Sequence, residues 1–309
     1  MKNQKDIKRK IKAVASIQKV TKAMETMANI KLQKASKAAV SAREYFFELY
    51  SFVNQSVNAL TSQQLCSLSL CRKNETKNVL FVVFTSDKGL CGSLNGKMLH
   101  KFMEILKEET SHGRNVKVIA VGKKGIDFLR RRKVELISSY TGASGKQKKE
   151  IASKIIKDCT EAFISEKIDA VYLYYNHYIS TSKSEINALN ILPLPFEVEK
   201  PYEHIPMIIL PVFEEVYPET KFALPVFTFE PEPMIFVKEL FVKYLEVMVI
   251  QIMLESEASE NAARMIAMQQ ATTNASEMID NLNIVYNKAR QSQITGEIIE
   301  VVSSAEALR

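Results

Sequence analysis

The chain has 309 residues, of which 46% are hydrophobic and 25% charged, so its composition is that of a folded protein rather than a disordered chain. No apolar run approaches the roughly 18 residues that a membrane-spanning helix needs, and the basic start lacks the apolar core of a secretory signal. We therefore expect a soluble cytoplasmic protein of one or two domains.

The positive charge is concentrated at the start of the chain. Residues 1–43 contain twelve Lys or Arg residues and two acidic ones, a net charge of +10, whereas the whole chain carries +7 and the remainder therefore −3. A basic helix of this kind could bind nucleic acid, an anionic membrane surface or an acidic protein collar, or form a solvated face. Because it lacks regularly interleaved aromatic residues, a protein partner is favoured over nucleic acid.

The first part of the chain is predicted to be helical, because residues 1–88 contain neither glycine nor proline. We expect one helix over most of Lys5–Leu60. Its apolar residues fall into three sets, and the breaks in phase between the sets predict a contact seam that shifts from face to face. The sets are Ile7, Ile11 and Val14, then Val20, Met24 and Met27, then Ala28, Leu32, Ala35 and Ala39.

The last part, Met234–Arg309, contains no proline and a single glycine, Gly296. One helix there would exceed about 100 Å, too long to be buried in a globular core. Apolar residues recur at alternating steps of four and three, which predicts a coiled-coil seam with the N-terminal helix as partner. The predicted seam is Ala271, Ala275, Met278, Leu282, Val285 and Ala289.

The middle of the chain holds eight of the nine glycines and all nine prolines. Buried-strand patterns alternate there with helical ones, which predicts a Rossmann-like α/β domain. The expected strands are Val79–Ser86, Val116–Gly122, Val134–Tyr140, Ala170–Ser180 and Glu185–Leu194, and the expected helices Leu94–Thr110, Lys124–Arg131 and Gln147–Glu166. The predicted domains are residues 1–75 (helix), 76–195 (α/β), 196–233 (proline-rich connection, possible hairpin) and 234–309 (helix).

The glycines after the first strand do not form a phosphate cradle. Gly92 and Gly96 are four residues apart where a P-loop needs five, Met98 stands where a magnesium-binding Ser or Thr belongs, and the spacing also misses GxGxxG. We therefore expect Asp87 to cap the following helix or turn and Cys91 to be a buried thiol.

The four cysteines and four histidines show no zinc-binding or catalytic spacing. We expect reduced thiols, and neither a metal, a cofactor nor a catalytic site of the chain's own.

Three segments in chain order, Gln18–Glu25, Asp87–Gly92 and Tyr286–Val302, resemble the gamma subunit of the F-type ATP synthase, and Ser259–Thr272 is similar to it as well. The resemblance implies an antiparallel coiled coil of the terminal helices plus the α/β domain. It also implies a central rotor stalk, non-catalytic itself, that couples ion-driven c-ring rotation to conformational changes in catalytic beta subunits.

The partners that the resemblance implies are the alpha and beta subunits around the shaft, the epsilon subunit and the c-ring. It places the chain peripherally at the cytoplasmic face of the bacterial inner membrane, with membrane contact only through the c-ring and no nucleic acid. Residues that resemble the family's beta-subunit contacts are Lys19, Lys22, Met24, Arg290, Gln291 and Thr295, with Glu297 in support. Those similar to its c-ring and epsilon contacts are Phe227, Phe229 and Glu230.

The sequence departs from the family pattern at the C-terminal end. Gly296 stands where the family has a better helix former, which costs roughly 1 kcal/mol and could soften the tip. Ser303–Ala307 replaces a small glycine-alanine ending, and the cysteine pair of plastid versions is missing. Two alternatives stay open: a basic coiled-coil nucleic-acid-binding protein, and a nucleotide-dependent enzyme built on the α/β domain.

Overall fold

The computed structural model comprises two compact units. The helical unit combines Met1–Ile30 with Arg264–Arg309, and the sheet unit is Lys31–Ala263. The residues that the structure describes are 4–57, 59–72, 75–143, 145, 147–194 and 232–307. The proline-rich connection lies almost wholly outside them, and the division into four sequence domains stays a prediction.

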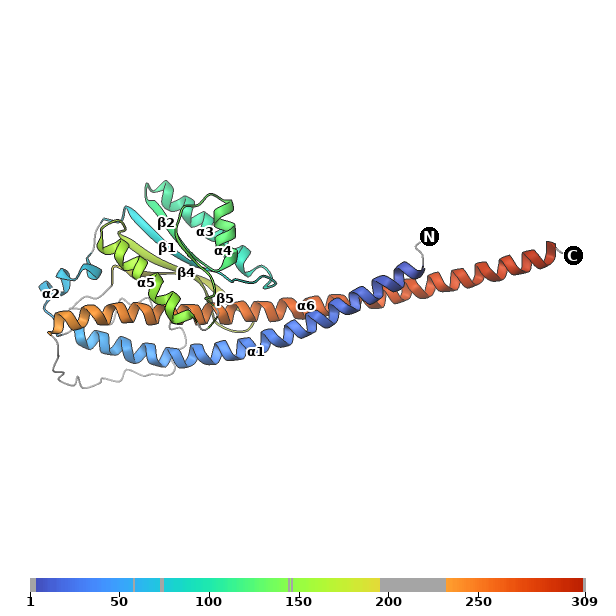
Figure 1. Cartoon of the computed structure of the whole chain (residues 1–309), viewed down its shortest axis with the longest axis horizontal. Helices are drawn as coiled ribbons and strands as arrows, with labels where there is room; N and C mark the ends of the chain where they lie inside the picture. The colour runs from blue at the N-terminus through green and yellow to red at the C-terminus, as the bar shows by residue number, and fades with distance from the viewer. Residues whose placement is uncertain are drawn as a thin grey trace. The chain divides into compact units, whose positions relative to one another are not determined.

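Two long helices begin and end the described chain (Figure 1). Helix α1 spans Gln4–Val57 and helix α6 spans Pro233–Ala307, so both predicted terminal helices are confirmed. Neither has an internal proline, and Pro233 stands at the first helical position, where its missing N–H costs nothing. Each helix contributes one part to the helical unit and one to the sheet unit. None of the helices in the described residues is long and apolar enough to cross a membrane.

The described residues of the sheet unit form five strands, in the order β3-β2-β1-β4-β5. Neighbours among β1 to β4 are parallel, and β5 is antiparallel to β4. This is the predicted Rossmann-like layout with an antiparallel edge strand, which a short loop after β4 requires. The strands are β1 (Asn78–Phe84), β2 (Asn115–Val121), β3 (Leu136–Tyr140), β4 (Ala170–Tyr178) and β5 (Ser184–Leu192).

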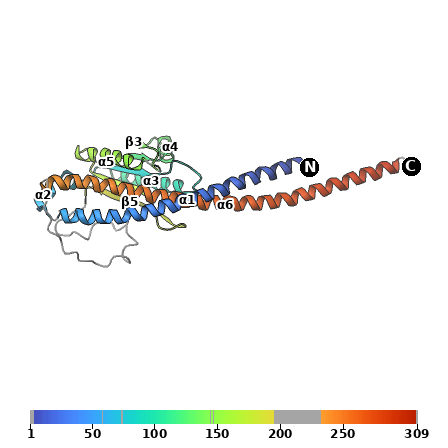
Figure 2. The same ribbon diagram turned by 60° about the horizontal axis from the view of Figure 1, so that its bottom comes forward.

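Helices cover both faces of this sheet, and accordingly β1 is apolar from Val79 to Phe84. Helices α3 (Leu94–Ser111) and α4 (Lys123–Arg131) pack on one face. Helix α5 (Lys148–Ile164) and the sheet-unit parts of α1 and α6 pack on the other. Figure 2 shows these parts of α1 and α6 lying side by side. The sheet is thereby fixed against both terminal helices.

Within the sheet unit α1 and α6 run antiparallel. Phe46 stacks on Tyr244 with ring centroids 5.4 Å apart, and farther along α1 Phe52 meets Phe236 edge-on at 5.9 Å. The residue number of the contact on α6 falls as that on α1 rises, which shows the expected antiparallel arrangement. Two short elements, helix α2 (Ser62–Ser67) and the 3₁₀ turn η1 (Ser69–Cys71), follow α1 and were not predicted, because they are too short to show periodicity.

The predicted seam of α6 in the helical unit is wrong at three positions, because the observed seam passes through Thr272 rather than Ala271 and avoids Met278 and Val285. Met278 and Val285 are 53% and 47% exposed, and their neighbours Ile279 and Tyr286 are the half-buried residues. In each of these two pairs both residues are apolar, so the spacing of apolar residues in the sequence could not show which of the two faces α1. The observed seam is Met268, Thr272, Ala275, Ile279, Leu282, Tyr286 and Ala289, a regular alternation of four and three.

The predicted shifts in the α1 seam are also wrong. Val20 and Met27 are each 58% exposed, whereas buried or half-buried residues recur without a break in phase. The prediction failed because Gln18, Thr21 and Glu25 are polar and were not counted. Between Ile7 and Ala39 the observed seam of α1 is Ile7, Ile11, Val14, Gln18, Thr21, Glu25, Ala28, Leu32, Ala35 and Ala39.

Candidate protein-binding interface

The first group of predicted contact residues lies on the α1 part of the helical unit. Lys19 and Lys22 are exposed, and Met24 is half-buried beside the seam. Lys22 Nζ lies 3.0 Å from the carboxylate of Glu25 one turn on. Because the seam takes Gln18 and Thr21, Lys19 faces away from α6, whereas Lys22 flanks the seam. Both side chains are exposed and can meet an acidic partner.

The second group lies near the end of α6. Arg290, Gln291, Thr295 and Glu297 are all exposed. The Thr295 hydroxyl donates to the Gln291 carbonyl over 2.9 Å, and the Gln293 amide donates to Glu297 over 2.9 Å. Arg290 makes no ion pair with another residue that the structure describes. These side chains are therefore held only by their own helix and are available to a partner.

The two groups do not form one site. Thr21, between Lys19 and Lys22, is paired with Thr272, whose hydroxyl donates to it over 2.8 Å. Eighteen residues separate Thr272 from Arg290, which corresponds to about 27 Å along an α-helix. The interface therefore has two levels along the helical unit, and a single partner loop cannot reach both.

The end of α6 presents apolar side chains that no other described part of the chain covers. All residues from Arg290 to Ser304 are exposed, including five large aliphatic ones. A single helix of this length is marginal in water, and apolar surface of this kind marks an interaction site. The sequence pattern did not single them out, because they lie on a different side of the helix from the predicted seam, which ends at Ala289. They are Ile294 (46% exposed), Ile298 (57%), Ile299 (60%), Val301 (69%) and Val302 (56%).

The third predicted group, Phe227, Phe229 and Glu230, lies outside the described residues. Its role stays a prediction.

The loop after β1 serves a structural purpose. Asp87 Oδ1 accepts from Lys123 N at the start of α4 over 3.0 Å, and Oδ2 accepts from Gly142 N over 2.9 Å. The prediction that Asp87 caps the following helix or turn is therefore wrong, because its carboxylate binds the start of α4 and the loop after β3 instead. Parallel strands bring the loops after β1, β2 and β3 to one edge of the sheet, so the carboxylate reaches the two loops beyond its own.

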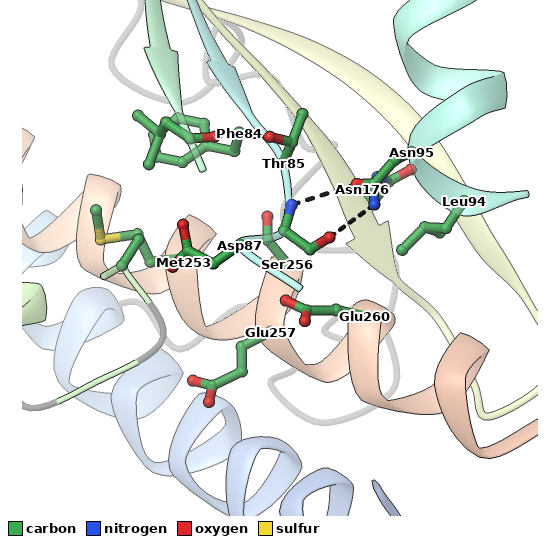
Figure 3. A pocket seen from close by; sticks show the side chains of 13 residues that line it. Phe84, Thr85, Asp87, Leu94, Asn95, Asn176, Met253, Ser256, Glu257 and Glu260 are labelled. Carbon is green, nitrogen blue, oxygen red and sulfur yellow. Dashed lines mark hydrogen bonds between the residues drawn. The ribbon is translucent and has the colours of Figure 1, made fainter. Parts of the chain in front are cut away.

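That edge is where doubly wound folds bind ligands, at the point where the strand order reverses. Here α6 lies against it, and a cavity of about 30 Å³ remains (Figure 3). Ligand pockets typically measure about 300 Å³ or more, so this one holds a water or two. Asp87, Glu257 and Glu260 add carboxylates to its lining, which would repel a phosphate.

The Cys91 thiol is buried, as predicted, with 3% of the residue exposed. Asn95 Nδ2 donates to its sulfur over 3.2 Å and to Ser86 Oγ over 2.6 Å. Burial also raises the pKa of Cys159, and it raises that of Cys71 to about 12. Thiols held protonated are poor nucleophiles. In the described part of the chain no three side chains are grouped as metal ligands.

Comparison with known proteins decides the family. The ATP synthase family profile matches residues 3–308. The ATP synthase gamma chain of Stenotrophomonas maltophilia (strain R551-3) is 34% identical over 304 residues, which cover 98% of this chain and 99% of the relative. That of Xanthomonas campestris pv. campestris (strain B100) is 33% identical with the same coverage.

The chain belongs to the ATP synthase gamma-chain family. This confirms the resemblance seen in the sequence, and it supports the gamma-chain function over the nucleic-acid-binding alternative.

Solved structures agree with gamma-chain membership. The central stalk and c-ring structure of the Tetrahymena thermophila mitochondrial ATP synthase contains a chain that is 25% identical, with a TM-score of 0.56, covering 82% of this chain and 99% of that one. A chain of the Euglena gracilis mitochondrial enzyme has the same TM-score at 17% identity, covers 93% of this chain and 95% of its own length, and shows the fold alone. The predicted fold class of a gamma chain, a coiled coil of terminal helices plus an α/β domain, is confirmed.

Proposed function

We propose that this chain is the rotor of an F-type ATP synthase and couples ion-driven rotation of a c-ring to conformational changes in catalytic beta subunits. The observation that carries the proposal is the end of α6, where a single helix with five exposed aliphatic side chains continues past the last residue of the seam, Ala289. A surrounding ring of alpha and beta subunits would cover that surface. The chain itself is non-catalytic, and the small acidic cavity beside β1 supports this.

The coupling follows from unequal contacts. A partner shifts a conformational equilibrium only by the difference between its interactions with the two states. Arg290, Ile294 and Ile298 are four residues apart and lie along one side of the helix end, whereas the polar Gln293 and Glu300 lie on another side. The helix end therefore meets three identical beta subunits with three different surfaces. As the shaft turns, each subunit meets each surface once, so the preferred conformation passes around the ring.

The composition of the two groups of predicted contact residues suits rotation of the shaft rather than binding at one fixed angle. Near the end of α6 most contacts would be apolar and non-directional, with few charged anchors such as Arg290. Deep free-energy minima at single angles are thereby avoided. The lysines on α1, Lys19 and Lys22, would be attracted to acidic loops of a partner. This attraction is screened by salt and is weak at exposed sites.

The epsilon subunit and the c-ring would bind away from this end of α6, through residues that include Phe227, Phe229 and Glu230. The chain would then be peripheral to the cytoplasmic face of a bacterial inner membrane. Its membrane contact would be made by the c-ring alone, because none of its own described helices could span a bilayer.

Co-purification tests the proposal. A tagged copy of the full chain, expressed in the source organism in place of the untagged chain, should co-purify with alpha, beta and epsilon subunits. Each assembly should contain one copy of this chain. The complex should hydrolyse ATP although the isolated chain does not. If instead the tagged chain carries nucleic acid at physiological salt and none of these subunits, the rotor proposal is wrong.

A further inference from the structure

Four polar side chains are buried together inside the sheet unit, where α1, α6 and β4 meet. They are Arg43 on α1, His177 on β4, and Gln251 and Glu255 on α6. The side chains of Glu255 and His177 are only 1% and 3% exposed, and that of Arg43 is 14% exposed. No step of the proposed rotary function described so far uses them.

The Glu255 carboxylate is the centre of this group. His177 Nδ1 lies 2.6 Å from one carboxylate oxygen. The other oxygen accepts from Gln251 Nε2 over 3.0 Å and lies 3.5 Å from Arg43 Nη2. Gln251 also donates to the Ala39 carbonyl over 3.3 Å. One carboxylate thus joins the sheet, through His177, to both long helices.

These contacts fix the position of α6 in a way that its apolar contacts cannot. The same helix buries Phe241, Leu245 and Ile252 against the sheet unit, but apolar contact is non-directional and a helix can slide along it. A buried carboxylate is different, because a shift that removed its donors would leave a desolvated charge. One turn on, Ser259 Oγ donates to the Asn176 carbonyl over 3.2 Å and adds a second directional contact to β4.

We propose that Glu255, held by His177 and Arg43, is the positioning residue that locks the α/β domain to the helix pair, so that torque applied to one is delivered to the other. This rests on the proposed rotor function. Under load the sheet and α6 are pulled in different directions, and Glu255 is the point at which a directional contact resists slip. Because α6 continues as one helix to Ala307, slip at Glu255 would alter the angle of its far end.

The experiment uses the assembled complex in inverted membrane vesicles and measures two rates, ATP hydrolysis and ATP-driven ion uptake, the latter followed for both H⁺ and Na⁺. The variants are Glu255→Gln, His177→Leu and His177→Lys, with Glu239→Gln as the matched control at an exposed α6 carboxylate. Glu255→Gln and His177→Leu should lower the number of ions moved per ATP by about twofold or more while hydrolysis is kept. His177→Lys, a cationic donor to Glu255, should restore the ratio.

A purely structural role predicts something else: fewer assembled complexes, with hydrolysis and uptake falling together, and no rescue by lysine. That result, or a normal ratio in all variants, overturns the proposal. If Glu255→Gln fails to assemble, the comparison of His177→Leu with His177→Lys decides. Failure of the rotor function itself would be recognised separately, because the unmodified tagged chain would then not bring down alpha and beta subunits.

Discussion

Thr272 of α6 donates a hydrogen bond to Thr21 of α1 over 2.8 Å, and Thr21 in turn donates to the Gln18 carbonyl over 3.0 Å. This polar pair lies between Gln18 and Glu25 in the α1 seam and between Met268 and Ala275 in the α6 seam. The bond between the two hydroxyls favours one relative position of the helices, because a shift of either helix would break it and leave each hydroxyl only the carbonyl of its own helix, that of Gln18 or Met268.

Replacing both threonines by valine should therefore cost less than the sum of the two single replacements. Thr21→Val and Thr272→Val should each destabilise the helical unit by about 1 kcal/mol, and the double variant by less than the sum. Hydrogen exchange of the amides around Thr272 in the full chain measures this locally. Strictly additive effects would mean that the hydroxyls do not act as a pair.

Gly296→Ala should stabilise the end of α6. A Cβ at this position would meet nothing within 4 Å, and alanine is favoured over glycine in a helix by about 1 kcal/mol. Hydrogen exchange near residue 296 should slow by about fivefold. If rotation needs a soft tip, turnover of the complex falls as the helix is stiffened.

Gly122→Ala is the contrasting substitution. A Cβ there would lie 2.0 Å from the Thr85 carbonyl oxygen, at a φ of 96° that alanine rarely adopts. It should destabilise the sheet unit and leave exchange near residue 296 unchanged.

Asp87→Ala should loosen the loops at the carboxyl edge of the sheet. It removes the acceptor for Lys123 N and Gly142 N, and loss of a helix cap typically costs about 1 to 2 kcal/mol. Urea unfolding of the full chain measures the change. Asp127→Asn, at an exposed carboxylate on α4, serves as the control and should be neutral. Equal effects of the two variants would argue against the capping role.

Arg290→Ala should impair the assembled complex without unfolding the chain. Arg290 is exposed, so its loss should leave stability nearly unchanged. Truncating an arginine at a protein interface commonly costs about 1 to 2 kcal/mol, which predicts a loss of about five- to thirtyfold in ATP turnover. Lys154→Ala, at an exposed position of α5, is the control. Normal turnover in Arg290→Ala would remove this residue from the interface.

The thiols near the end of α1 should react with iodoacetamide at very different rates. Cys66 is exposed, whereas burial, with a smaller effect of the nearby Cys66, raises the pKa of Cys71 from 9.0 to about 12. Because only the thiolate reacts, Cys71 should stay nearly inert at pH 8.5 in the folded chain and react once urea is added.

The sign of the pH dependence follows from the same shift. The folded chain keeps the Cys71 proton up to about pH 12, whereas the unfolded thiol loses it near 9.0, so the contribution of Cys71 to stability falls as the pH rises between these values. Mass spectrometry of peptides from wild-type and Cys66→Ser chains identifies the modified residue. Equal labelling of both cysteines at pH 8.5 would contradict the burial of Cys71.

The sequence by itself determined the elements and the family. Long stretches without glycine or proline specify the two helices, because nothing in them interrupts the backbone hydrogen bonds, and β1 and β2 were recognisable as apolar runs followed by glycine turns. The basic N-terminal helix was likewise visible from its charge, and the contact residues Lys19 and Arg290 were predicted from the resemblance to the family.

Only the tertiary structure decided how these parts meet. The choice of Ile279 over Met278 depends on which side of α6 faces α1, and both residues are apolar. Asp87 reaches α4 because the sheet gathers distant loops. The group around Glu255 joins side chains more than 200 residues apart, and its one sequence signal was a Gln251–Glu255 pair, one turn apart, in an otherwise apolar run. A buried charge is tolerated only where partners surround it, and those partners come together only when the chain folds.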